Sequence, residues 1–315
     1  LYAKEIASSS TKYSTINGYG PASAKDAFEQ YLGISLTPRP DDAGNAWCLD
    51  NIDAKDVWMG SGTFNGATGN NVVVAVIDTG IDTDHPEFKN KIVKSWDFVA
   101  NNSNAEDDQG HGTHVAGTIA GAKDNIGVTG VAYNAKIMPL DIFFTAYNPY
   151  EGRTDWTFKT EYLVDAIRYA ADKGADVINM SLGCPPDPRI YSALQYAESK
   201  NVVCVSASGN GYRKVGRSSP SYPAAYATKY GFAVGADNIN KQITRFSDRA
   251  GSNSAMQYLT APGEEVYSSI TNGRYAASDG TSMASPHIAG ICALLKSYDK
   301  SLTPAQIKSI LTSSG

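Results

Sequence analysis

The chain has 315 residues, of which 42% are hydrophobic and 19% charged, and its net charge is −5. This composition is typical of a globular protein and excludes a largely disordered one. The acidic balance argues against a nucleic-acid partner, which would need a basic face, and no apolar run approaches the roughly 20 residues that span a bilayer.

The first 45 residues differ in composition from the rest of the chain. They are rich in Ser, Thr, Tyr, Gly and Pro, with one predicted helix at 24–33 and a cluster of helix breakers at 37–45. We interpret residues 1–45 as an N-terminal extension or the remnant of a pro-segment, ending in a linker. Residues 46–315 are predicted to form one large domain.

Predicted strands and helices alternate through this domain. The continuous apolar run at 72–77 is typical of a strand buried on both faces. Further strands are predicted at 136–143, 176–182, 201–207, 231–236 and 256–263, and helices at 160–174, at 189–201 and after 282. The stretch 143–160 is predicted to be a long aromatic surface loop. The alternation predicts an α/β fold with a doubly wound, mostly parallel sheet flanked by helices, whose ligands bind at the carboxyl ends of the strands.

The four cysteines are too widely spaced for a zinc ribbon. Cys204 and Cys292 lie in apolar segments and are predicted to be buried. Cys48 and Cys184 lie in turn-rich stretches and could form a disulfide if the protein is exported, and the sequence leaves this open.

Two polar residues mark the ends of structural elements in the first half of the domain. Asp78 directly follows the buried strand, where capping of a turn is the structural alternative. His111 opens a small-residue helix between two glycines, which leave its imidazole accessible. The pair His111 and His114 lacks the Glu that an H-E-x-x-H zinc protease needs, and His114 is predicted to be packed.

Two more candidates come later in the chain. Ser282 lies at the start of a helix, where a capping hydroxyl is the structural alternative, and Asn210 follows the strand that ends at Ala207. A serine hydroxyl becomes a nucleophile when an imidazole takes its proton and a carboxylate orients that imidazole. Asp78, His111 and Ser282 are far apart in the sequence, so the fold has to bring them together.

The segments that carry these residues are similar to the signatures of the subtilisin-like serine proteases, the subtilases. They read "VAVIDTGID", "GHGTHVAGT", "VINMSLG", "ASGN" and "GTSMASPHIAG". The resemblance covers residues 45 to 315 and implies a serine endopeptidase with Asp78 orienting His111, His111 as general base and Ser282 as nucleophile. Asn210 is implied as the side-chain donor to the oxyanion.

The resemblance also implies residues that bind substrate. Ser181, Leu182 and Gly183 would run beside the peptide as a strand, Ala207, Ser208 and Gly209 would form a pocket wall, and Ser221 would lie near the pocket base. In the branch that cleaves after basic residues, an acidic residue follows this Gly, and Asp187 matches it in position. Asp187 would then favour Arg or Lys at P1, and Asp107 and Asp108 a basic residue at the next subsite. The alternative is that all three are solvated loop acids.

The segment 122–132 is similar to the calcium loop of the family. Its implied ligands are the side chains of Glu87 and Asp124, the main-chain carbonyls of Ala122, Ile126 and Val128, and a group near Asp42. Calcium binds six to eight such oxygens, whereas the alternative is an ordinary turn. Polypeptides are the implied substrates, the N-terminal segment a possible inhibitor of its own enzyme, and a monomer the expected state.

Alternative functions have different requirements. A transpeptidase or macrocyclase of the same fold would need to shield the acyl-enzyme from water, and no added element for this is evident. An inactive peptide-binding module would not need an intact set of catalytic residues. A dinucleotide site is excluded because "GSGTFNG" precedes the first strand instead of following it. We also expect a secreted, periplasmic or cell-surface enzyme.

Overall fold

A computed structural model describes residues 13–36 and 46–314. Its centre is a seven-stranded sheet with the order β2-β3-β1-β6-β7-β8-β9, in which all neighbouring strands run parallel. The strands are β1 (Val73–Asp78), β2 (Trp96–Asp97), β3 (Lys136–Asp141), β6 (Val177–Met180), β7 (Val203–Ala207), β8 (Phe232–Asp237) and β9 (Tyr258–Pro262). The predicted α/β fold with a mostly parallel sheet is confirmed.

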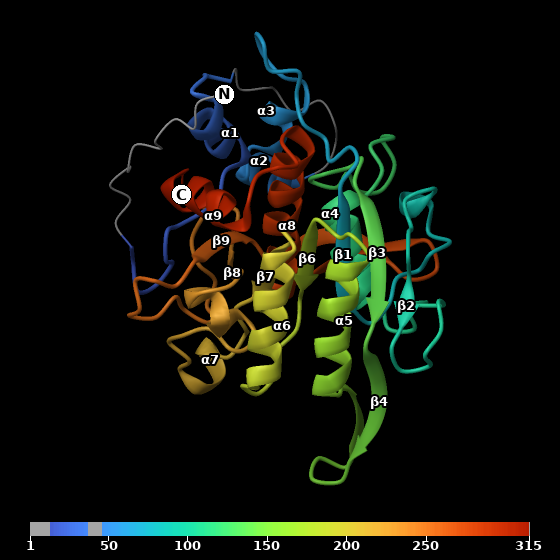
Figure 1. Ribbon diagram of the computed structural model, residues 1–315. Coiled ribbons are helices and arrows are strands. Elements are labelled where there is room, and N and C mark those ends of the chain that lie inside the picture. The colour runs from blue at the N-terminus through green and yellow to red at the C-terminus, as the bar shows by residue number, and fades with distance from the viewer. Residues whose placement is uncertain (1–12, 37–45, 315) are drawn as a thin grey trace.

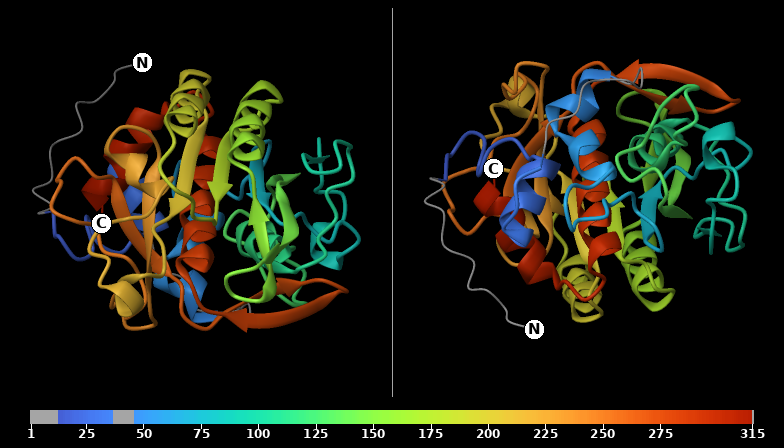
Figure 2. Two further views of the ribbon diagram at one scale, coloured as in Figure 1. Left: turned by 90° about the horizontal axis from the view of Figure 1, so that it is seen from below. Right: turned by 90° about the horizontal axis from the view of Figure 1, so that it is seen from above.

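Helices cover both faces of this sheet. α4 (His111–Ala120) and α8 (Thr281–Tyr298) lie on one face, and α5 (Thr160–Asp172) and α6 (Pro188–Ser199) on the other (Figure 2). Successive side chains of β1 alternate between the two cores, since Val74 and Val76 pack with the α4–α8 core and Ala75 and Ile77 with the α5–α6 core. This two-sided burial explains why β1 is apolar at every position before Asp78.

The order of the strands places a crevice at the end of β1. β3 pairs with one edge of β1 and β6 with the other. After β1 the chain continues to β2 and β3 on one side of the sheet, whereas after β6 it continues to β7, β8 and β9 on the other side. At such a switch point the carboxyl ends of the strands leave room between diverging loops for a ligand. Asp78 is the last residue of β1, at this crevice.

The described N-terminal residues pack against the sheet and the main core. Main-chain hydrogen bonds join Gly20 and Ala22 to Thr260 of β9, extending the sheet edge. α1 (Ala24–Leu32) begins at Ser23, whose hydroxyl caps the helix, and buries Phe28 in the main core. Residues 13–36 therefore wrap the surface of the domain (Figure 1), and the predicted linker at 37–45 lies outside the described residues.

The remaining elements are short or lie at the periphery. The helices are α2 (Ala46–Asn51), α3 (Ala54–Trp58), α7 (Tyr212–Val215) and α9 (Pro304–Ser314), with 3-10 turns η1 (Pro86–Phe88) and η2 (Ala224–Thr228). Two antiparallel hairpins pair β4 (Phe143–Asn148) with β5 (Arg153–Phe158) and β10 (Val266–Ile270) with β11 (Arg274–Ser278). The prediction of a loop at 143–160 was wrong, because cross-strand pairing turns most of it into the β4–β5 hairpin that projects from the body in Figure 1.

All four cysteines are free thiols, so the possible Cys48–Cys184 disulfide is not formed. Cys48 is buried in α2, whereas Cys184 lies near Tyr222 beside the pocket described below. Burial raises the pKa of each thiol, to about 12 for Cys48 and for Cys184. They are therefore unreactive thiols rather than candidate nucleophiles.

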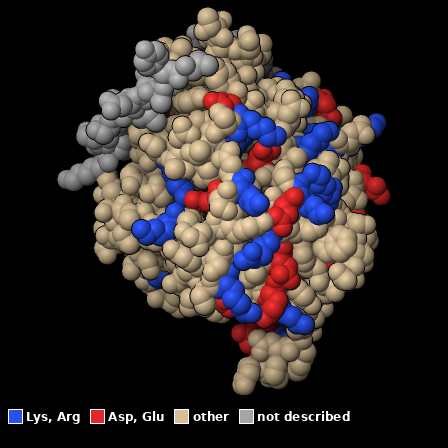
Figure 3. Space-filling model, viewed as in Figure 1, with Lys and Arg blue, Asp and Glu red and all other residues tan. Residues whose placement is uncertain are grey.

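The surface over α5 and α6 carries charges of both signs. Figure 3 shows Lys and Arg side chains interleaved with Asp and Glu there, without a patch of one sign. One of the pairs joins Arg189 of α6 to Glu161 of α5 at 2.9 Å. In the described ranges, no helix offers an apolar stretch of the length that a bilayer crossing requires.

Candidate active site

A carboxylate and an imidazole meet at the carboxyl edge of the sheet. His111 Nδ1 lies 2.7 Å from Asp78 Oδ1, and the Asp78 side chain is only 1% exposed. Asp78 Oδ1 also accepts the Thr79 N–H at 2.8 Å. Because a buried carboxylate is poorly solvated, this contact fixes the ring of His111 and favours its protonated form.

The start of α4 is held so that His111 faces Asp78. The Asp107 carboxylate accepts hydrogen bonds from the N–H groups of Gln109, Gly110 and Thr113. Gly112 is required here because a Cβ on it would overlap the Gly80 carbonyl oxygen. The helix thus approaches the turn after Asp78 closely enough for the two side chains to bond.

Two opposing effects set the pKa of His111. Burial disfavours the imidazolium, but the charge and hydrogen bond of Asp78 outweigh it, so the pKa of His111 lies above its ordinary value. By contrast, His114 bonds to the main-chain oxygens of Val266 and Ala276, and burial lowers its pKa to about 4. His114 is packed, as the sequence predicted.

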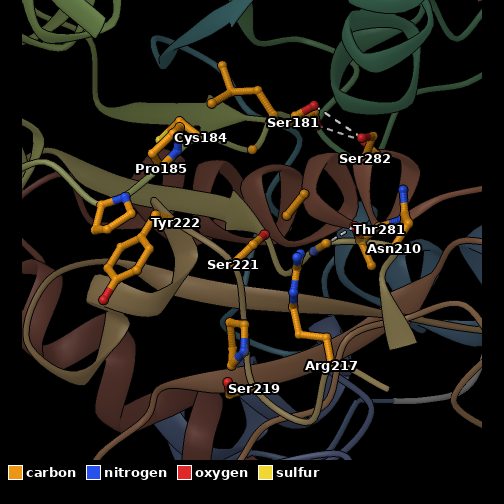
Figure 4. A pocket seen from close by; sticks show the side chains of 16 residues that line it. Ser181, Cys184, Pro185, Asn210, Arg217, Ser219, Ser221, Tyr222, Thr281 and Ser282 are labelled. Carbon is orange, nitrogen blue, oxygen red and sulfur yellow. Dashed lines mark hydrogen bonds between the residues drawn. The ribbon is translucent and has the colours of Figure 1, made fainter. Parts of the chain in front are cut away.

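Ser282 is the second residue of α8 and lies at the end of β6. In this structure its Oγ donates to the Ser181 carbonyl at 3.1 Å, and the Ser181 hydroxyl donates to the Ser282 carbonyl at 2.7 Å (Figure 4). Behind them, the Asn179 side-chain NH₂ donates a hydrogen bond to Ser181 Oγ, and Asn179 Oδ1 accepts one from the Ser285 hydroxyl. This chain of bonds fixes the first turn of α8 against the sheet.

The Asn210 side chain is oriented by the residue before Ser282. Its Oδ1 accepts the Thr281 N–H at 2.9 Å and the Thr281 hydroxyl at 3.1 Å. An amide whose oxygen is occupied in this way turns its NH₂ group toward other partners. Asn210 and Ser282 line the same pocket, so this donor is available beside the hydroxyl.

That pocket is a cavity of about 760 Å³ between β6, β7 and the start of α8 (Figure 4). Its lining includes these predicted binding residues: Ser181, Leu182, Gly183, Ala207, Gly209 and Ser221. Ser208 is fully buried behind the wall and does not line the cavity. The predicted pocket is therefore assembled except for Ser208.

The three acids that were predicted to bind basic substrate side chains do not line the pocket. Asp187 caps α6 through the Arg189 N–H and pairs with the Arg189 guanidinium at 2.7 Å, and it does not line the pocket. The Asp107 carboxylate accepts main-chain hydrogen bonds at the start of α4. Asp108 lines a separate acidic hollow beside Asp82 and Glu106.

Two residues of this site were missed by sequence reasoning. Arg217 lines the pocket but lies in a polar loop without a motif, and Asn179 is a polar residue inside the buried strand β6. A polar side chain at a position that is fully buried usually has a hydrogen-bonding role, and this signal could have pointed to Asn179.

The segment predicted to bind calcium encloses Glu87. The Glu87 carboxylate accepts the N–H groups of Ala122 and Val128 and the Tyr275 hydroxyl, and Asp124 accepts the Ile126 N–H. No three His, Cys, Asp or Glu side chains in the described parts of the chain form a metal cluster, so a site here would depend on main-chain carbonyls. Asp42 lies outside the described residues.

Comparison with known proteins identifies the family. Residues 69–315 match the model of the subtilase family. The chain belongs to this family. The major intracellular serine protease of Bacillus subtilis (strain 168) is 37% identical over 255 residues, which are 79% of this chain and 74% of that protein. An intracellular serine protease of Paenibacillus polymyxa is 35% identical over 270 residues, 82% of this chain and 76% of that protein.

A solved structure supports the same assignment for this subtilase. A cold adapted subtilisin-like serine proteinase superposes with a TM-score of 0.67 and 32% identity, covering 84% of this chain and 89% of that one. The enzyme is therefore a serine endopeptidase that acts on polypeptides.

The expected location of this subtilase needs correction. We expected a secreted, periplasmic or cell-surface enzyme, but the two curated relatives above are named intracellular serine proteases. The similarity to these two relatives overturns the expectation.

Proposed function

We propose that this subtilase cleaves peptide bonds through an acyl-enzyme formed on Ser282, with His111 and Asp78 completing a catalytic triad. The 2.7 Å contact between His111 Nδ1 and Asp78 Oδ1 is the observation that carries this proposal. It leaves Nε2 as the ring nitrogen that accepts a proton. The mechanism requires the Ser282 hydroxyl to leave the Ser181 carbonyl and donate to that nitrogen.

In the proposed reaction, Ser282 Oγ attacks the scissile carbonyl as its proton passes to His111. His111 then donates this proton to the leaving amine, and a water molecule repeats the sequence on the acyl-enzyme. Asp78 stays ionised and stabilises the imidazolium. The Ser282 N–H at the start of α8 and the Asn210 NH₂ group would hold the oxyanion.

A peptide ester tests this chemistry and separates hydrolysis from ligation. We expect a burst of alcohol close to one equivalent per enzyme, followed by steady release of the free acid. Adding an amine acceptor in the same assay should leave the acid as the main product. Neither a burst nor any transfer of the acyl group to the amine would contradict the acyl-enzyme, whereas transfer to the amine as the main product would favour a transpeptidase.

Asn210→Ala should lower kcat by about 10²- to 10³-fold with little change in KM, because the lost donor binds the oxyanion and not the ground-state carbonyl. The measurement is steady-state hydrolysis of a peptide p-nitroanilide. Asn240→Ala, in an exposed turn, is the matched control. Equal losses in kcat for both variants, or a change confined to KM, would contradict the assigned role.

We also propose that the loop around Glu87 binds calcium, held by Glu87, Asp124 and the carbonyls of Ala122, Ile126 and Val128. The juxtaposition of Glu87 with the loop supports this, although binding would have to exchange some of its present N–H contacts. At calcium about 100 times above Kd, stability should rise by about 2.7 kcal/mol, seen as a Tm higher than in EDTA.

The control for this calcium effect is Glu87→Gln, which should have a Tm that no longer responds to the ion. Magnesium at the same concentration checks for a general salt effect. A wild-type Tm that is equal in calcium and EDTA would contradict the site.

A further inference from the structure

One charged side chain faces the pocket beside Ser282. Among the described residues that line the cavity, Arg217 is the only one with a formal charge. In Figure 4 its side chain enters the cavity from the end opposite Ser282. A substrate side chain that fills this pocket would therefore meet a guanidinium group.

A buried carboxylate anchors this guanidinium. Arg217 Nη1 lies 3.3 Å from Asp248 Oδ2, and the Arg217 side chain remains 45% exposed while Asp248 is completely buried. Asp248 Oδ1 accepts the Gly211 N–H at 2.7 Å. An arginine has five N–H donors in a planar fork, so one contact with Asp248 leaves others for a ligand.

Asp248 itself is screened from the pocket. A Cβ on Gly209 would overlap both Asp248 Oδ2 and Ser221 Oγ, so the Gly209 backbone lies directly against the carboxylate. Gly209 lines the pocket and Asp248 does not. The charge accessible to a ligand is therefore positive, although the pair as a whole is neutral.

Asp187, the acid that was expected to favour a basic substrate side chain, does not offset the positive charge of Arg217 in the pocket. Asp187 is paired with Arg189 and does not line the cavity. A lysine or arginine placed here would meet a like charge in a partly desolvated site, which is unfavourable. A glutamate or aspartate would gain charge-assisted hydrogen bonds.

We propose that Arg217 makes this pocket select an acidic side chain, Glu or Asp, on the residue that precedes the scissile bond. The proposal rests on the proposed function, in which the pocket beside Ser282 receives that residue. Arg217 is then a specificity-determining residue, held in place by Asp248, and Ser282 chemistry does not depend on it.

Matched peptide p-nitroanilides that differ only in this residue test the proposal. We expect kcat/KM for Glu to exceed that for its neutral isostere Gln by on the order of tenfold, and that for Lys by more. High salt should reduce the ratio of Glu to Gln, because the interaction is electrostatic. In Arg217→Gln this ratio should fall to about one.

Arg213→Gln is the matched control, because Arg213 is an exposed cation of the same segment that does not line the pocket. It should keep the ratio of the wild type. Arg217→Gln leaves Asp248 without its counter-charge. The double variant with Asp248→Asn removes both charges, and its ratio should also be about one. Each ratio compares two substrates on one preparation, so partial loss of folded enzyme cancels.

Three results would overturn the proposal. A wild type that cleaves the Gln or Lys peptide as fast as the Glu peptide contradicts acidic selection, as does an unchanged ratio in Arg217→Gln. Both leave the serine-protease chemistry intact. If no peptide is cleaved and the ester gives no burst, the proposed function fails and the specificity proposal fails with it.

Discussion

Replacing Ser282 by alanine is expected to lower kcat about 10⁶-fold, as loss of the nucleophile does in subtilisin. The variant keeps His111, Asp78 and the pocket, so substrate should still bind with a similar KM. Without the hydroxyl no acyl-enzyme forms, and only the oxyanion donors and substrate binding remain to accelerate hydrolysis by water. Steady-state kinetics on a peptide p-nitroanilide measures this loss.

Ser297→Ala provides the control for this loss. Ser297 lies near the other end of α8, where its hydroxyl bonds to the Leu294 carbonyl. Its removal should leave kcat within a few-fold of the wild type. A Ser282→Ala enzyme that retained more than about a hundredth of the wild-type kcat would show that another group is the nucleophile.

Asp78→Asn is expected to lower kcat by about 10⁴-fold with the fold intact. An amide can present its NH₂ group to His111 and so favour the wrong tautomer, and it cannot stabilise the imidazolium. Asp78 Oδ2 is buried without a hydrogen-bond partner among the described residues, and Oδ1 is shared by the Thr79 N–H and His111, so His111 is the ionisable group paired with this carboxylate. Asp84→Asn, at an exposed position in the segment that follows β1, should have little effect.

The pH dependence of kcat/KM gives a second readout for Asp78. His111 acts as a base only when neutral, and its raised pKa places the rising limb of activity above about pH 6.5, the ordinary histidine value. In Asp78→Asn, burial lowers the pKa of His111 without the opposing effect of the carboxylate. The rising limb of the residual activity should therefore shift to lower pH. An unchanged limb would contradict the coupling of these two residues.

The elements with strong local signals were predictable from the sequence. The apolar run before Asp78 is β1, and the periodic segment after Thr160 is α5, because each is set by burial against the sheet. The β4–β5 hairpin was not predicted because its pairing depends on contacts between strands that a local pattern does not show.

The residues of the candidate site also fall into two groups, those that the sequence could predict and those that it could not. Asp78 and His111 could be predicted as partners because both lie in long motifs, and the structure brings them into contact. The sequence could not show that Asp187 lies outside the pocket, because its position depends on its ion pair with Arg189. Arg217 reaches the pocket from a loop that has no regular pattern, so only the folded chain shows its position.

The central claim is that His111 and Asp78 activate Ser282, and labelling with a fluorophosphonate tests it most directly. We expect one adduct per molecule, located on Ser282 by peptide mass spectrometry. The adduct should be absent in Ser282→Ala and form far more slowly in His111→Ala. Labelling of another residue in the wild type, or equally fast labelling of Ser282 without His111, would contradict the account.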